Sequence, residues 1–85
     1  MTIKNNSKDT ELKEFIDIFI ETLELEDASN INAQTDFKSL DDWDSLASLS
    51  IISMVDDRFG VTINKKEVRA CDTIEDLFNM IISKQ

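Results

Sequence analysis

Residues 44–60 read DSLASLSIISMVDDRFG, and this run contains both ends and the buried face of one helix. Its apolar side chains recur at helical spacing: Ala47, Ile51, Met54, Val55 and Phe59, with Ile52 beside them. Asp44 or Ser45 suits the start, because short polar side chains cap free backbone N–H groups. Gly60, the only glycine of the chain, suits the end, because glycine enters the left-handed conformation freely. The pattern predicts a helix over residues 45–59.

A second amphipathic segment lies upstream, at about residues 10–24. Its start suits a cap at Asp9 or Thr10. Its apolar side chains fall on one helical stripe: Leu12, Phe15, Ile16, Phe19, Ile20 and Leu23. Ile18 lies off the stripe. Residues 1–8 are polar, and we expect them to form a frayed tail.

Residues 25–44 show no sustained helical or strand period. A connection of this length inside a small domain is usually functional or carries structure of its own. Its large apolar side chains are scattered rather than periodic: Ile31, Phe37, Leu40 and Trp43. We therefore expect a long ordered loop between the first two helices, held to the core by these side chains.

A short extended link and a short helix are expected after Gly60. The link is Val61-Thr62-Ile63. Asn64 followed by Glu67 three residues later is the spacing of a capping box, which predicts a short helix at about residues 65–69.

The last helix begins with Thr73 and Asp76, or with Asp72 and Glu75, as its cap. It extends to about residue 83, and one stripe forms its apolar face: Ile74, Leu77, Phe78 and Ile81. The whole chain is therefore predicted to be one all-α domain, a small bundle of three longer helices and one short helix.

Composition excludes several classes of function. The 85 residues contain no histidine and one cysteine, so neither Ser-His-Asp nor Cys-His catalysis is available, and we expect neither enzymatic activity nor a metal site. The net charge of −9 repels nucleic acid and anionic membranes, attracts basic protein surfaces and favours a monomer. No apolar run is long enough to cross a bilayer, and one cysteine offers no disulfide framework, so a cytoplasmic setting is expected.

Ser45 is the residue whose predicted position best suits a covalent modification. At the first turn of a helix, its hydroxyl lies among unsatisfied backbone N–H groups at the positive end of the helix dipole. A phosphate ester is favoured at such a position. Because the chain offers no base to activate the hydroxyl, Ser45 is more plausible as the substrate of another enzyme than as a nucleophile. Ordinary helix capping by Asp44 and Ser45 is the simpler alternative.

A second face of the same helix resembles a docking surface. Five residues share it: Leu46, Leu49, Ser53, Asp56 and Asp57. Two leucines followed by acids combine an apolar anchor with a charged rim. The alternative is a solvated face with two incidental leucines.

The sequence resembles the acyl carrier protein family from its first helix through Ile82. The resemblance is carried by Asp44-Ser45-Leu46 and by a set of downstream positions: Ile51, Val55, Asp56, Asp57, Phe59, Gly60, Val61, Ile63 and Thr73. Membership implies a four-helix bundle. It also implies a 4′-phosphopantetheine arm on Ser45, which a phosphopantetheinyl transferase installs from coenzyme A and which holds acyl groups as thioesters.

The partners implied by the resemblance are that transferase and acyl-loading, ketosynthase or acyltransferase enzymes with basic docking patches. Two features depart from the family pattern. Asp42-Trp43 stands where the family motif usually has a glycine. Housekeeping fatty-acid carriers commonly have more acids and a methionine in the second helix, where this chain has Ala47, Ser48, Ser50 and Ser53. A fatty-acid carrier and a carrier for a specialised pathway, such as a polyketide-like one, both remain open.

Two alternatives to an acyl carrier also remain. One is an aminoacyl or peptidyl carrier, although the Gly-Gly-x-Ser pattern of peptidyl carriers is missing. The other is an unmodified acidic helical adaptor that binds basic proteins.

Three further residues or groups have simpler interpretations. Cys71 is expected to be a small buried side chain rather than a reactive thiol. Trp43 suits either a partner contact or an anchor for the long loop. The acids around Asp42 do not match a calcium-binding EF-hand loop, because Ala47 and Ser53 stand where glycine and glutamate are required.

Overall fold

The computed structural model describes the backbone of residues 3–85 and the side chains of residues 10–85. Four α-helices and one 3₁₀ turn follow one another: α1 (Ile3–Leu23), the 3₁₀ turn η1 (Phe37–Ser39), α2 (Ser45–Phe59), α3 (Lys65–Arg69) and α4 (Ile74–Lys84). No strand occurs in the described part of the chain. The predicted all-α bundle of three longer helices and one short helix is confirmed.

The first helix is longer than expected. It begins at Ile3 and continues through Asp9 and Thr10, the residues that the sequence pattern predicts as its cap. Residues 3–8 are therefore helical and not a frayed tail, while residues 1–2 lie outside the described residues. The polar stretch contains no glycine or proline, so nothing in it stops a helix that the core holds further along. The polar composition of these residues therefore does not mark the end of the helix.

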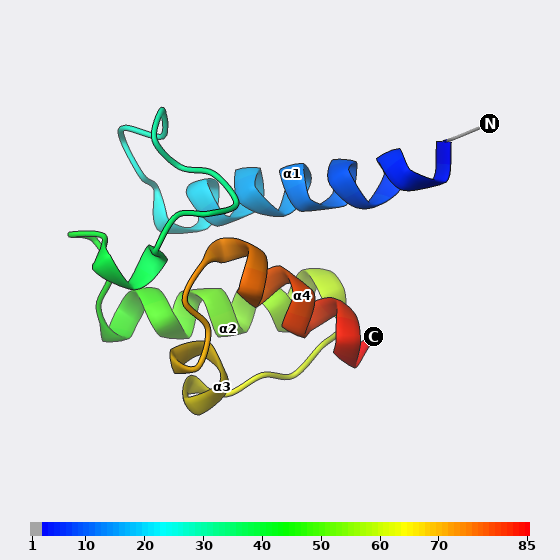
Figure 1. Ribbon diagram of the computed structural model, residues 1–85. Helices are drawn as coiled ribbons and strands as arrows, with labels where there is room; N and C mark the ends of the chain where they lie inside the picture. Colours follow the sequence, from blue (N-terminus) through cyan, green and yellow to red (C-terminus); the bar gives the residue numbers. More distant parts are fainter. Residues whose placement is uncertain (1–2) are drawn as a thin grey trace.

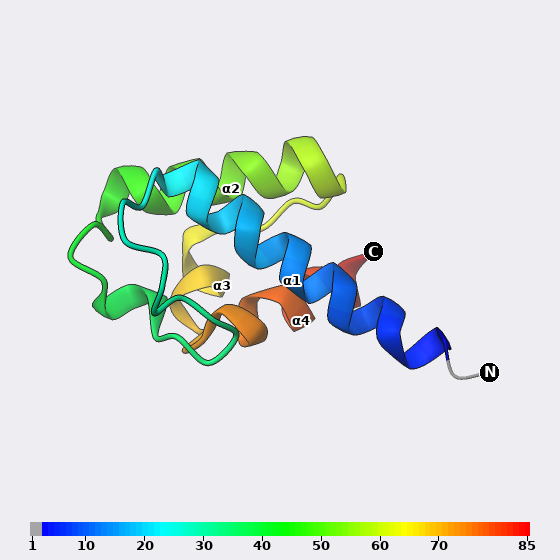
Figure 2. The same ribbon diagram turned by 90° about the horizontal axis from the view of Figure 1, so that it is seen from above.

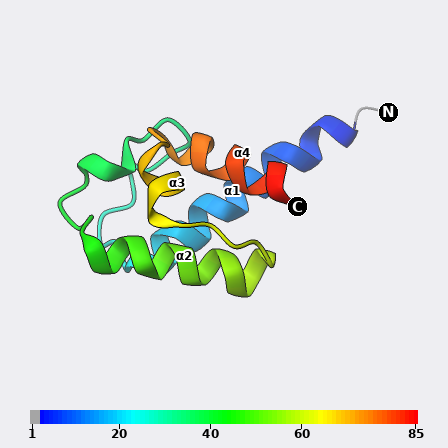
Figure 3. The same ribbon diagram turned by 90° about the horizontal axis from the view of Figure 1, so that it is seen from below.

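The helices pack around a core rich in phenylalanine. α1 packs on α2 and α4, and α2 packs on α3 (Figures 1 and 2). Each expected stripe supplies buried side chains: Phe15 and Phe19 from α1, Ile51, Met54 and Val55 from α2, and Ile74, Leu77, Phe78 and Ile81 from α4. Ile18, expected off the stripe, packs against the edge of this core. In Figures 1–3 the N-terminal part of α1 projects beyond the other helices.

The helix ends follow the predicted caps. Gly60 ends α2 with φ 66°, the left-handed conformation. A capping box of Asn64 and Glu67 begins α3, and one of Thr73 and Asp76 begins α4. Between them, Val61 and Ile63 are buried while Thr62 is exposed, as an extended link requires.

The long loop between α1 and α2 is held in place by apolar side chains in the core and by hydrogen bonds to the start of α4. Phe37 is fully buried, and the other large apolar side chains pack against the core: Ile31, Leu40 and Trp43. The N–H groups of Ile74 and Glu75 donate to the loop carbonyls of Thr35 and Ala33 at 3.2 and 2.9 Å. The loop therefore supplies acceptors for free N–H groups at the start of α4.

In the described part of the chain, no helix is long and apolar enough to cross a membrane.

Candidate functional site

Asp44 and Ser45 take separate positions at the start of α2. Asp44 is the N-cap residue, and its Oδ1 accepts a hydrogen bond from the Ala47 N–H at 2.8 Å. Ser45 is the first residue of the helix. The sequence left the cap open between these two residues, and the structure assigns it to Asp44. The Ser45 side chain is therefore not needed to cap the helix.

The Ser45 hydroxyl is accessible. The residue is exposed, and its hydroxyl forms no hydrogen bond with any side chain or backbone group that the structure describes. It lies at the positive end of a 15-residue helix, in the first turn, where an attached anion is favoured.

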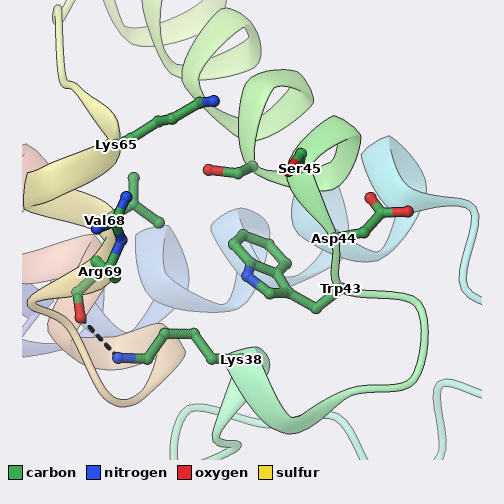
Figure 4. A pocket seen from close by; sticks show the side chains of 8 residues that line it. Lys38, Trp43, Asp44, Ser45, Lys65, Val68 and Arg69 are labelled. Atoms are coloured by element: carbon green, nitrogen blue, oxygen red, sulfur yellow. Dashed lines mark hydrogen bonds between the residues drawn. The ribbon is translucent and has the colours of Figure 1, made fainter.

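A pocket of about 230 Å³ opens beside Ser45, between the start of α2 and α3. Figure 4 shows Trp43 and Ser45 on one side of it and Lys65, Val68 and Arg69 on the other. Lys38, from η1, closes the lower edge. Figure 3 shows the same region from below, with α3 lying close to the start of α2. The pocket thus joins η1 and the start of α2, which are close in the sequence, to α3, which follows further along the chain.

The cations around this pocket differ in their partners. The Lys38 ammonium donates to the Arg69 carbonyl oxygen at 2.7 Å and lies 3.7 Å from a carboxylate oxygen of Asp72. Lys65 and Arg69 are exposed, and their side chains form no ion pair or hydrogen bond with the described residues. Two positive side chains of an acidic protein are therefore available at the pocket.

Trp43 forms a rigid wall of the pocket. Its ring system stacks on Phe19 with 5° between the planes, and it meets Phe37 edge-on at 4.9 Å between centroids. These contacts hold the end of the loop to α1. The role of loop anchor, one of the two that the sequence allowed, is therefore the one that these contacts support.

The predicted docking residues share one surface of α2. Among the residues whose side chains are described, Leu46 and Leu49 are the exposed large apolar ones, with 72% and 47% of their surface accessible. They line a shallow groove with Ser53, Asp56 and Asp57. Arg58 also lines this groove and lies 3.9 Å from a carboxylate oxygen of Glu21. The structure brings the five residues together but contains no partner.

Cys71 is buried, as expected. Its Sγ donates to the Glu67 carbonyl oxygen at 3.5 Å. Burial, followed by the nearby Asp76 charge, raises the pKa of the thiol. A raised pKa leaves less thiolate at neutral pH, which lowers the reactivity of the side chain. The side chains described here form no cluster of three or more metal-ligating residues.

Sequence reasoning missed the basic residues at the pocket. Lys65 and Arg69 are four residues apart, which places them on one face of α3. That spacing was readable, but the direction of the face depends on how α3 packs against α2. The place of Lys38 at the pocket could not be predicted, because nothing in the loop's sequence shows which helix this residue approaches.

The residues at this site fit the phosphopantetheine expected from the resemblance. An accessible hydroxyl, a helix N-terminus, an apolar wall and free cations suit a phosphate ester with an apolar portion.

Comparison with protein families agrees with this geometry. The chain matches the family model described as "Phosphopantetheine attachment site" over residues 13–81. Compared with curated proteins and with solved structures, the chain gives no match. Since the family model covers most of the 85 residues, the chain belongs to the phosphopantetheine attachment family, whose members are non-catalytic carriers that bear a 4′-phosphopantetheine group.

Proposed function

We propose that this chain is an acyl carrier protein and that Ser45 is the residue that bears its phosphopantetheine. The observation that carries the proposal is the Ser45 hydroxyl. It is exposed and unbonded among the described residues, at the first position of α2 and beside a pocket. The arm supplies a thiol that holds acyl groups as thioesters. The chain positions the arm and presents its cargo to other enzymes.

The attachment is a phosphoryl transfer from coenzyme A. The Ser45 oxygen forms a bond to the phosphorus next to the pantetheine portion, and the P–O bond of the pyrophosphate breaks. Adenosine 3′,5′-bisphosphate leaves. The hydroxyl proton passes to a base of the transferase, since this chain has no histidine to accept it.

The test is the intact mass of the protein after incubation with a broad-specificity phosphopantetheinyl transferase, coenzyme A and magnesium. Wild type should gain one phosphopantetheine, and Ser45→Ala should gain none. Ser48→Ala is the matched control, since Ser48 lines the same pocket one turn later and should leave the modification intact. A modified Ser45→Ala protein, or an unmodified wild type beside an active control carrier, would overturn the proposal.

We further propose that the groove on α2 docks partner enzymes. Its leucines offer an apolar anchor, and Asp56 and Asp57 add charge that attracts basic patches. The family supports interaction with transferases and pathway enzymes, and basic patches on acyl-loading, ketosynthase or acyltransferase enzymes are the partners that this surface suits.

The docking surface has its own test. Asp56→Asn/Asp57→Asn should lower kcat/KM for the transferase and flatten its dependence on salt. Glu11→Gln/Glu14→Gln removes the same charge from α1 and lines a different groove, so it is the control. Equal losses in the two double variants would show that total charge, rather than this surface, guides the encounter.

The cargo is proposed to be an acyl group, with aminoacyl or peptidyl groups as the alternative. The absence of a Gly-Gly-x-Ser pattern at Ser45 favours the acyl type. Mass analysis of the protein purified from its source, before and after thioester cleavage with hydroxylamine, identifies the cargo directly. Recovery of an acyl hydroxamate supports the proposal, and recovery of an aminoacyl hydroxamate contradicts it.

The family match sets aside the third possibility, an unmodified adaptor, because members of the family bear the attached group. The pathway, fatty-acid or specialised, follows from the cargo. The proposal includes a monomer in the cytoplasm, which the net charge of −9 and the single cysteine favour.

A further inference from the structure

Basic residues are concentrated in the pocket beside Ser45, although the protein as a whole is acidic. The chain has 9 basic residues and 18 acidic ones, and three of the basic residues line the pocket beside Ser45: Lys38, Lys65 and Arg69. In the same pocket the only acidic residue is Asp44, whose Oδ1 is engaged by the Ala47 N–H. The side chains that line this pocket therefore carry a net positive charge, opposite in sign to the net charge of the whole molecule.

Two elements present these cations to the pocket. Lys65 and Arg69 are one helical turn apart on α3, so both face α2 across the pocket (Figure 4). The Lys38 ammonium donates to the Arg69 carbonyl oxygen at 2.7 Å, which holds η1 against the end of α3. Because Lys65 and Arg69 have no partner among the described residues, their charges are available to an anion.

Trp43 and Val68 give the pocket an apolar side. Trp43 is fixed by its contacts with Phe19 and Phe37, and Val68 is 98% buried between the two basic residues of α3. The pocket therefore combines a cationic rim with an apolar wall, next to the hydroxyl that is to be modified.

We propose that this pocket holds the proximal end of the phosphopantetheine arm, and so restrains the arm at its base. This inference rests on the proposed attachment to Ser45. The phosphodiester is anionic and matches Lys65 and Arg69, while the neighbouring methyl-bearing carbon of the arm matches Trp43 and Val68. The part of the arm beyond this pocket is then left free to move.

The restraint is an equilibrium between a docked and a free arm base. An exposed cation shifts such an equilibrium modestly, by about 1.4- to 5-fold in the docked-to-free ratio. Removing both cations should multiply the two effects if they act independently. Salt should act in the same direction by screening the charges.

The experiment uses phosphorus NMR on the phosphopantetheinylated protein, together with backbone amide shifts between the unmodified and modified forms. The variants are Lys65→Gln and Arg69→Gln, singly and combined. Lys66→Gln is the matched control, because Lys66 lies on α3 between them and does not line the pocket. Unfolded modified protein in urea gives the phosphorus linewidth of a free arm base.

We expect a broader phosphorus line in the folded wild type and in Lys66→Gln than in the unfolded reference. The double variant should move toward the reference, and the amides of Lys65 and Arg69 should lose their response to modification. Added sodium chloride should narrow the wild-type line. A phosphorus line and amide shifts that are the same in wild type, the double variant and Lys66→Gln would overturn the restraint while leaving the attachment standing. An unmodified wild type in the mass measurement would instead overturn the attachment itself.

Discussion

At the scale of single residues, Asp44 and Ser45 have different roles at the start of α2. Asp44 satisfies the backbone through its bond to the Ala47 N–H, and Ser45 is left with an unbonded hydroxyl among the described residues. A serine that capped the helix itself would have its oxygen committed to a backbone N–H. The aspartate of the Asp-Ser-Leu motif therefore keeps the serine available for modification.

This division predicts unequal costs of substitution. Asp44→Ala should lower the free energy of unfolding by about 0.5–2 kcal/mol, the usual value of a lost N-cap. Ser45→Ala should cost less, because Ser45 is not the cap. Urea denaturation of both variants measures the difference, with Asp42→Ala as the control for losing an exposed aspartate near the site. A larger cost for Ser45→Ala than for Asp44→Ala would contradict the assignment.

Much of the residue-scale result could be predicted. Gly60, the capping boxes and Cys71 follow from local rules, because each depends on its own few neighbours. The choice between Asp44 and Ser45 as cap could not be made, since both side chains have the required oxygen. The role of Trp43 as a loop anchor could not be chosen from the sequence either, because it depends on contacts with Phe19 and Phe37, which are not its neighbours in the sequence.

At the scale of elements, the five-residue helix α3 is the shortest of the four α-helices and is tied to its neighbours by side-chain bonds. Its capping box uses Glu67, whose carboxylate also accepts from the Lys84 ammonium at 2.7 Å. Glu67 therefore links the start of α3 to the end of α4. Since Lys65 and Arg69 lie on α3, this link also positions the cationic side of the pocket.

The link predicts a pH dependence. The bond from Lys84, followed by that from the Asn64 N–H, lowers the pKa of Glu67 in the folded protein. Its stabilisation is therefore complete above the unfolded value of about 4.5 and is lost as the pH falls through the folded pKa. Glu67→Gln, which keeps a side-chain acceptor, should be less stable than wild type at neutral pH, and the gap should close in acid.

Thermal unfolding of Glu67→Gln and wild type between neutral pH and about pH 3 measures this gap. Glu11→Gln is the control, because Glu11 is exposed and unpaired among the described side chains. A gap that stays constant with pH would mean that the charge of Glu67 does not stabilise the link.

The spacing of apolar residues in the sequence predicts the buried faces of the helices but not where every helix begins. The apolar stripes located the buried faces of α1, α2 and α4, because burial alone sets them. They did not locate the start of α1, since the turns before Thr10 lie at the projecting end and need no stripe. The loop was recognised by its length, but its bonds to α4 join residues about forty positions apart.

At the scale of the whole molecule, charge is distributed unevenly. The net charge is −9, the groove on α2 ends in acids, and the pocket beside Ser45 is lined by cations. Another group of acids surrounds the loop: Glu24, Glu26, Asp27, Asp41 and Asp42. The overall charge could be read from the sequence, but the cationic pocket within it depends on the packing of α3 and η1 against α2.

The acidic group predicts a salt-dependent stability. Asp41→Asn/Asp42→Asn should raise the melting temperature at low salt, because it relieves repulsion among neighbouring carboxylates. The gain should shrink as sodium chloride is added, since salt screens the same repulsion. Calorimetry at several salt concentrations measures it. A gain that does not depend on salt would assign the effect to the local turn rather than to charge.

The central claim is that Ser45 is the residue that bears phosphopantetheine. The most direct measurement is fragmentation mass spectrometry of the modified wild-type protein, which locates the adduct among the serines of α2: Ser45, Ser48, Ser50 and Ser53. The account predicts the whole adduct on Ser45. An adduct on any other residue, in protein that is otherwise folded, would contradict it.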